Sequence, residues 1–203
     1  MAEETKSKAA DVLLAPTLNM VRSPSAGRNH ETYGEDPFLL GILSACFVNG
    51  CQDRGIAATP KHFVANEAEN RRTTLDVQVS EKALREIYLE PFRLVMKHST
   101  PLCFMTSYNS VQGEFVRQSK RLIQDVLRGE WGFTGLVISD WGGTYSTIAP
   151  IKAGLDLAMP GKRRHRQDKL LRAVQSGGVS EKLVDASVIR IPRVAFEAGE
   201  MGE

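Results

Sequence analysis

The sequence lacks a surplus of either charge, a long apolar run and an apolar leader, and each absence excludes a class of protein. Its 203 residues carry 26 basic and 24 acidic side chains, so the charge gives no reason to expect a nucleic-acid or anionic-membrane partner. No apolar run approaches the roughly 18–20 residues that a membrane span needs. The polar first residues do not form a signal peptide, so the chain as written is expected to be cytoplasmic, or secreted if its true amino terminus lies further upstream.

Cysteine is also scarce. Cys46, Cys51 and Cys103 are an odd set without the spacing of metal ligands. Cys46 and Cys51 lie five positions apart in a segment expected to be helical, and both are expected to be buried as small apolar side chains. Thiols of this kind fit a reducing, intracellular setting. The sequence therefore predicts no metal site.

Short, continuously apolar segments alternate with longer amphipathic ones. Four or five apolar residues without polar alternation are typical of parallel strands that are covered on both faces. Five such segments are present, at residues 12–15, 56–59, 102–106, 136–139 and 155–158. Strands and helices in this order predict an α/β protein with a parallel sheet. A closed (β/α)8 barrel has eight strands and about 250 residues, so five strands indicate either a barrel that lacks its first units or a smaller open sheet.

Helical periodicity fills the intervals between these strands. Residues 81–98 have the clearest pattern, with Ser80 in the N-cap position and Pro91 predicting a kink or a restart. Three further segments repeat the helical period, at 122–127, 170–174 and 183–189. Residues 22–37 form a long polar loop, and loops of this length in compact domains are usually functional.

Polar clusters follow three of the expected strands, at residues 60–63, 107–109 and 140–143. Parallel α/β folds keep their sites at these carboxyl ends. Asp140 followed by Trp141 is suggestive, because a rigid strand-end carboxylate can attack the anomeric carbon of a sugar and an indole offers a flat platform for the ring. Lysine or arginine nearby would keep the carboxylate ionised. On spacing alone, a capping role for Asp140 and a core position for Trp141 remain open.

At these residues the sequence resembles the first, barrel domain of glycoside hydrolase family 3, the β-glucosidase group. The matching stretches include Lys61-His62-Phe63-Val64, Met105-Thr106-Ser107-Tyr108-Asn109 and Ser139-Asp140-Trp141, with others in family-like order at residues 15–19, 22–24, 27–31, 34–37, 66–72, 84–92, 127–133 and 154–161. Each stretch alone would be weak evidence. Together they cover nearly the whole chain, so the expected fold is a TIM-like (β/α)8 barrel that is incomplete at its N-terminal strands.

The resemblance implies a role for individual residues. Asp140 matches the nucleophile that forms the glycosyl-enzyme intermediate, and Trp141 matches the indole that lines the sugar site. Arg28, Lys61, His62 and Arg72 match side chains that bind sugar hydroxyls, and Met105 and Tyr108 match residues packed beside the nucleophile. The family uses no metal and no organic cofactor, and the implied substrate is a β-glucoside or a related small glycoside.

Some of these residues also have a purely structural explanation. A histidine such as His62 is more often structural than functional, although its place in a Lys-His-Phe stretch after a strand favours sugar binding. Glu69 and Arg72, three positions apart, could be only a surface pair. Surface positions are expected for His30, His98, His165 and the basic run 162–166.

The resemblance fails at two places that bear on activity. Family barrels begin upstream of this chain with strands that carry a sugar-binding Asp and a nearby Arg, and nothing here matches either. Retaining hydrolysis also needs a second carboxyl group about 5–5.5 Å from the nucleophile. In β-glucosidases of this family that group comes from an α/β-sandwich domain, which is expected to be absent from residues 1–203, and residues 64–66 lack the Asp–His dyad of single-domain relatives. Residues 1–203 are therefore expected to form a single partial barrel domain.

Two classes of function remain. The chain is either a β-glucosidase, or a fragment of one, that hydrolyses terminal β-glucosyl residues, or a non-hydrolytic descendant that binds a sugar or another small molecule or serves other biosynthetic chemistry. If the first strands are missing, the strand that begins at Val12 has an unpaired edge. That edge predicts a homodimer or a complementing chain.

Overall fold

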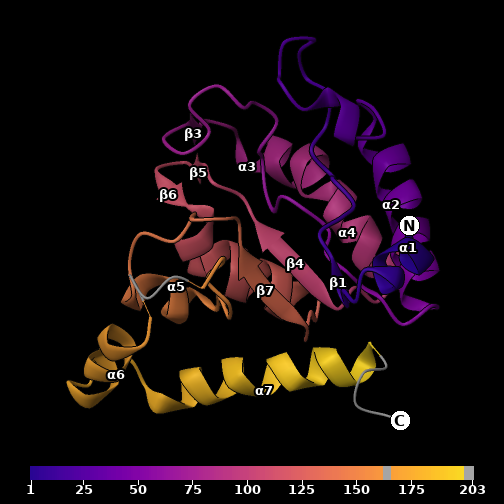
Figure 1. The fold of residues 1–203 in the computed structure, drawn as a ribbon. Helices are drawn as coiled ribbons and strands as arrows, with labels where there is room; N and C mark the ends of the chain where they lie inside the picture. The colour runs from indigo at the N-terminus through magenta and orange to yellow at the C-terminus, as the bar shows by residue number, and fades with distance from the viewer. Residues whose placement is uncertain (162–165, 199–203) are drawn as a thin grey trace.

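The structure is a computed structural model that describes residues 1–161 and 166–198 (Figure 1). In chain order its elements are α1 (Ala2–Ser7), β1 (Val12–Leu13), η1 (Asn29–Glu31), α2 (Pro37–Gln52), β2 (Ala57–Ala58), β3 (Asp76–Val77), α3 (Glu81–Ala83), η2 (Leu84–Tyr88), α4 (Glu90–His98), β4 (Cys103–Thr106), β5 (Ser110–Val111), β6 (Glu114–Phe115), η3 (Val116–Gln118), η4 (Arg121–Glu130), β7 (Leu136–Ser139), α5 (Ile148–Ala153), α6 (Asp168–Gln175) and α7 (Glu181–Glu197).

Parallel strands form the centre of the molecule. β1 pairs with β2, and β4 pairs with β7 over four residues. Single parallel bridges extend these ladders: Thr17 with Lys61, Phe63 with Thr106, and Ile138 with Leu157. The expected parallel α/β class is therefore confirmed. Helices α2 and α4 pack against each other beside these strands, and α7 runs along the opposite side of the molecule (Figure 1).

The expectation of a barrel is met only in part. Residues 1–161 and 166–198 contain short separate ladders and no closed barrel. Four of the five expected strands form, and the strand expected at 155–158 is wrong: within the described residues Leu157 contributes a single bridge. The carboxylate of Asp156 explains this difference. It accepts a hydrogen bond from the backbone N–H of Val137 at 2.8 Å, where a regular strand would offer a carbonyl.

A small second sheet was not expected. β3 lies parallel to β5, and β5 turns back into β6 through Gln112 and Gly113, both with positive φ. Two residues in the left-handed region are the geometry of a tight hairpin turn. β3, β5 and β6 each contain only one apolar residue, so no apolar run marks them in the sequence.

The helices follow the expected signals. Ser80 caps α3 by accepting a hydrogen bond from the backbone N–H of Ala83, and Pro91 lies in the first turn of α4 after the wide π-type turns of η2, which confirms the restart. The segments expected at 122–127, 170–174 and 183–189 lie within η4, α6 and α7. His30 and His98 are exposed as expected, whereas His165 and the run 162–165 lie outside the described residues.

One burial expectation is wrong. Cys51 is buried on α2, but Cys46 is exposed. The buried positions of α2 include Leu40, Ser44 and Val48, which recur every four residues on the face that packs against α4. Cys46 lies two positions from both Ser44 and Val48, which is about half a turn around the helix, and therefore points away from the core.

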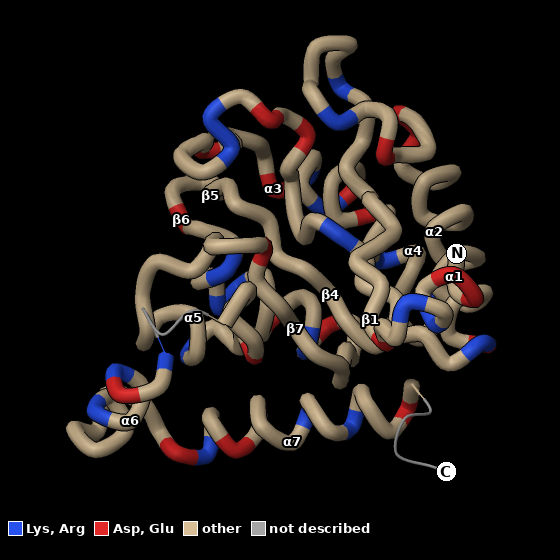
Figure 2. The backbone as a smooth tube through the Cα atoms, in the orientation of Figure 1, with Lys and Arg blue, Asp and Glu red and all other residues tan. Residues whose placement is uncertain are grey.

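The main core lies between the parallel strands and helices α2, α4 and η4. Three rings meet in it: Phe63 lies 5.3 Å from Phe92 and 6.2 Å from Phe104, measured between centroids, and Phe92 lies 6.1 Å from Phe104. Phe63 directly follows His62, so this cluster anchors the polar segment at the end of β2. Acidic and basic residues are interspersed along the chain (Figure 2). Across the described residues, no helix combines the length and apolarity that crossing a bilayer requires.

Candidate active site

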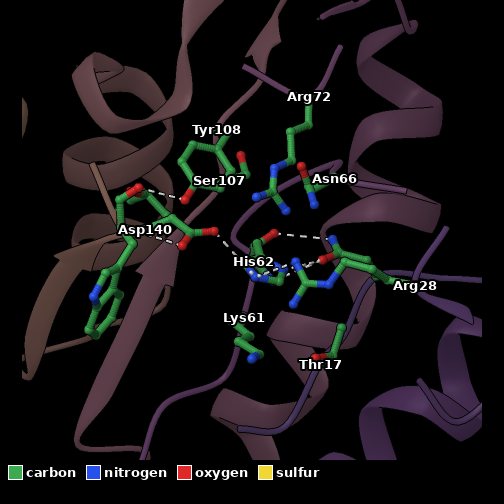
Figure 3. Close-up of polar contacts among 12 residues, drawn as sticks. Thr17, Arg28, Lys61, His62, Asn66, Arg72, Ser107, Tyr108 and Asp140 are labelled. Atoms are coloured by element: carbon green, nitrogen blue, oxygen red, sulfur yellow. Dashed lines mark hydrogen bonds and ion pairs between the residues drawn. The ribbon is translucent and has the colours of Figure 1, made fainter. Parts of the chain in front are cut away.

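The structure brings the strand-end polar residues together in one place (Figure 3). Lys61 and His62 follow β2, Tyr108 follows β4, and Asp140 follows β7. Because β4 and β7 are parallel, and Phe63 bridges to Thr106 in the same sense, the carboxyl ends of these strands lie side by side. Arg28 and Arg72 reach the same space from loops outside the sheet. The convergence expected at the strand ends is thus found.

The two carboxylate oxygens of Asp140 have different surroundings. Oδ1 accepts a hydrogen bond from the backbone N–H of Trp141 at 2.6 Å, and Oδ2 lies 3.5 Å from Nε2 of His62. The pKa of Asp140 is raised above its ordinary value, because burial outweighs the Trp141 N–H and the charges of Arg28 and Arg72. Nearby cations therefore favour the ionised carboxylate as expected, but they do not fully offset its burial.

His62 is held on both sides of its ring. Nδ1 lies 3.0 Å from Oδ1 of Asn19, and Nε2 lies 3.2 Å from Nη1 of Arg28. The pKa of His62 falls well below its ordinary value, chiefly because the ring is buried and also because Arg28 and Lys61 are close. The imidazole is therefore neutral at physiological pH.

Two glutamates neutralise the cations around the site. Glu31 receives two hydrogen bonds of 2.8 Å from Arg28 and lies 3.7 Å from Nζ of Lys61. Glu69 lies 2.5 Å from Nη1 of Arg72 and 3.6 Å from Nη1 of Arg28. The hydrogen bonds from Arg28 lower the pKa of Glu31 to about 2, whereas burial lowers the pKa of Lys61. The Glu69–Arg72 pair is part of the site rather than a separate surface pair.

Tyr108 connects the strand ends. Its hydroxyl donates a hydrogen bond to the carbonyl of Trp141 at 2.6 Å, and the guanidinium of Arg72 lies 4.7 Å from its ring centroid. Burial, with Asp140 nearby, raises the pKa of Tyr108 to about 12. Trp141 is 44% exposed.

Met105 differs from the other predicted residues. It is buried in an apolar cluster with Ala57, Cys103 and Ile138, and not among the polar groups. Its predicted position beside the nucleophile remains a prediction. The described residues contain no group of three or more His, Cys, Asp or Glu side chains that could hold a metal ion.

Sequence reasoning gave no role to Asn19, Glu31 or Glu69, although all three lie within the stretches that carry the family resemblance. Glu31 and Glu69 each pair with an arginine three positions away, a spacing that gives no sign of a site, and their contacts with Lys61 and Arg28 cross long stretches of sequence. Asn19 likewise contacts His62 across 43 positions.

The fold and the site define a class. This is a parallel α/β protein with a largely buried carboxylate and a neutral histidine at its strand ends, and with several paired cations around them. The sequence model described as "Glycosyl hydrolase family 3 N terminal domain" matches residues 1–194. The chain belongs to this family.

Known proteins of the family resemble the chain closely. Beta-glucosidase B of Emericella nidulans is 53% identical over 186 residues, which are 91% of this chain and 22% of that protein. The solved beta-glucosidase of Kluyveromyces marxianus in complex with glucose has a TM-score of 0.94 and 46% identity, over 98% of this chain and 24% of the other. Beta-glucosidase 3B of Thermotoga neapolitana in complex with glycerol has a TM-score of 0.91 and 43% identity, over 97% and 28%. The chain thus spans between 22% and 28% of the length of these relatives.

Proposed function

We propose that this chain carries the nucleophile of a retaining β-glucosidase, that Asp140 is that nucleophile, and that the substrate is a terminal, non-reducing β-glucosyl residue. The observation that carries the proposal is the asymmetry of Asp140. One carboxylate oxygen is held by the backbone N–H of Trp141, and the other faces the space enclosed by His62, Arg28 and Arg72. The beta-glucosidase names of the relatives, including one solved with glucose, support the same substrate.

The surrounding residues would bind the sugar. Arg28, Lys61 and Arg72 present N–H donors, and Arg and Lys have no acceptors, so they suit the lone pairs of sugar hydroxyls. The exposed indole of Trp141 suits the apolar face of the ring. Tyr108, which donates to the carbonyl of Trp141, would fix the distance between that platform and Asp140.

The chemistry takes place in two displacements. In the first, Oδ2 of Asp140 forms a bond to the anomeric carbon, and the bond from that carbon to the aglycone oxygen breaks, with its electron pair leaving on the oxygen. That oxygen takes a proton from an acid. In the second, water, deprotonated by the same group, displaces Asp140 and releases glucose with its anomeric configuration retained.

The acid is not among the groups that converge on Asp140 here. Glu69 is an acidic alternative, but its carboxylate oxygens already face the guanidinium groups of Arg72 and Arg28. We therefore assign the acid/base to a separate α/β-sandwich domain, and the sugar-binding Asp to additional N-terminal strands that would complete the barrel. Residues 1–203 are in this proposal a partial barrel domain.

The test isolates the nucleophile from the missing acid. A 2-deoxy-2-fluoro-β-glucoside with a dinitrophenolate leaving group needs no protonation to react, and its fluorine slows hydrolysis of the covalent intermediate. Incubation with the 203-residue chain should add one fluoroglucosyl unit to the peptide that contains Asp140, detected by mass spectrometry.

Two variants provide the controls. Asp140→Asn keeps the shape of the side chain and should abolish labelling, whereas Asp53→Asn, which changes an exposed carboxylate at the end of α2, should not change it. Labelling of a different residue would refute the nucleophile assignment. Tight glucose binding without any labelling would instead indicate a non-hydrolytic sugar-binding protein.

A further inference from the structure

The amide of Asn19 has a fixed orientation. Its Nδ2 donates a hydrogen bond to the carbonyl of His62 at 3.1 Å, and its Oδ1 accepts one from the backbone N–H of His62 at 2.9 Å. A backbone N–H is always a donor and a carbonyl always an acceptor, so the oxygen and nitrogen of this amide cannot be exchanged without losing both bonds. Asn19 and His62 are both buried.

This orientation determines which ring nitrogen of His62 carries the proton. Nδ1 lies 3.0 Å from the same Oδ1 of Asn19, which can only accept. Nδ1 must therefore be the protonated nitrogen. On the other side of the ring, Nη1 of Arg28 lies 3.2 Å from Nε2, and arginine can only donate. Two independent neighbours thus require the same tautomer, with a lone pair on Nε2.

The tautomer matters because of what Nε2 faces. Oδ2 of Asp140 lies 3.5 Å from it. In the opposite tautomer, or in the protonated ring, Nε2 would be a donor within reach of Oδ2, and a hydrogen bond between them would engage the oxygen that, in the proposed function, has to attack the sugar. Such a bond stabilises the carboxylate before the reaction and must be weakened as the new bond forms, so it slows attack.

We propose that Asn19 is a positioning residue that fixes His62 as the Nδ1–H tautomer and thereby keeps Oδ2 of Asp140 free of a hydrogen bond from histidine. The effect on catalysis rests on the proposed function, whereas the tautomer of His62 does not depend on it. Arg28, Lys61 and Arg72 all oppose protonation of the ring, whereas Glu31 favours it. Burial is the largest influence and also opposes protonation, so the neutral ring with its fixed tautomer is the species that Asp140 meets.

The tautomer can be read by ¹⁵N NMR in the sugar-free chain, because a protonated and a lone-pair ring nitrogen have well-separated shifts. The chain has only four histidines, and the His62 signals are assigned by their loss in His62→Gln. The wild type should show a protonated Nδ1 and an unprotonated Nε2. In Asn19→Leu, Nδ1 loses its acceptor and the proton should move to Nε2. Asn19→Asp keeps an acceptor at Nδ1 and, at mildly alkaline pH, should keep the wild-type pattern.

A matched control separates this role from general damage. Asn109 is another fully buried amide, which donates to the carbonyl of Val64 and makes no contact with His62. Asn109→Leu should leave the His62 signals unchanged. If Asn19→Leu does not fold, Asn19→Ala gives the same measurement with a smaller steric demand. A protonated Nε2 in the wild type would overturn the tautomer assignment. A wild-type pattern in both Asn19→Leu and Asn19→Ala would overturn the positioning role of Asn19, because Arg28 alone would then fix the tautomer.

The second measurement is the rate of Asp140 labelling by the fluoroglucoside. It should fall about tenfold in Asn19→Leu, the factor that corresponds to about 1.4 kcal/mol in the barrier, and should be restored in Asn19→Asp. A shifted tautomer with an unchanged labelling rate would refute the effect on Oδ2. Absence of labelling in every variant, including the wild type, would count against the proposed function, while the NMR result would still decide the tautomer.

Discussion

Replacing Asp156 with alanine should destabilise this protein severely without touching the chemistry of Asp140. The Asp156 carboxylate is fully buried and accepts four hydrogen bonds. They come from Arg128 and Arg190 at 2.7 Å each, from Val137 N–H at 2.8 Å and from Ser187 at 2.9 Å. These partners lie on η4, α7 and β7, so one side chain connects three elements. The side chain of Arg128 is 8% exposed, and alanine would leave its charge buried without its partner.

The magnitude follows from that arrangement. Removing one partner of a buried ion pair costs about 3–5 kcal/mol, out of a total stability of about 5–15 kcal/mol for a typical domain. For a chain of this length the melting temperature should fall by roughly 6–20 °C. Urea unfolding of Asp156→Ala beside the wild type measures the loss directly.

Asp125→Ala is the control, because Asp125 forms an exposed ion pair with Lys120 at 2.8 Å. Exposed pairs contribute about 0–1 kcal/mol, so this variant should unfold nearly as the wild type does. The folded fraction of Asp156→Ala should still be labelled at Asp140. If Asp156→Ala lowered the free energy of unfolding by less than about 1 kcal/mol, the reasoning that this carboxylate compensates the buried charge of Arg128 would be refuted.

Three further predictions concern charge, leaving group and assembly. Arg72→Gln removes a charge that lowers the pKa of Asp140, so the pH at which labelling is half lost on acidification should move upward; an unchanged midpoint would show that Arg72 is electrostatically remote. The chain should not measurably hydrolyse cellobiose and should turn over nitrophenyl β-glucoside only slowly, because acid help is typically worth about 10²–10⁴-fold for a poor leaving group; brisk cellobiose hydrolysis would reveal an unrecognised acid. In the described residues β1 pairs with β2 alone and Val12 is 39% exposed. The chain should therefore dimerise or precipitate through this strand edge. Sedimentation that shows a compact monomer over a wide range of concentrations would contradict this prediction.

The sequence was sufficient wherever a single local pattern determines position. Continuous apolar runs identified β1, β2, β4 and β7, and the rule that parallel folds keep polar residues at strand ends placed Lys61, His62, Tyr108 and Asp140 in one space. This works because a strand's direction fixes where its carboxyl end lies.

Other features depend on side chains that meet only after folding. Residues 155–158 have the composition of a strand, yet the Asp156 carboxylate takes a ladder position that backbone would otherwise take. Arg28 reaches His62 across 34 positions from a loop, and a loop's path has no periodicity to read. Cys46 shows the same limit at smaller scale, since its exposure depends on which face of α2 meets α4.

The site also shows why the proposed nucleophile, which is largely buried, is surrounded by both cations and other carboxylates. With His62 neutral, the charged groups cancel, as Arg28, Lys61 and Arg72 face Asp140, Glu31 and Glu69. Burial raises the pKa of Asp140 despite its neighbours, and a bound sugar would exclude more water and raise it further. If the cations were unpaired, they would bind Oδ2 directly and hold the nucleophile in its unreacted state. Because Glu31 and Glu69 occupy much of the donor capacity of Arg28 and Arg72, these cations act on Asp140 through space, which favours its ionised form without covering the oxygen that has to react.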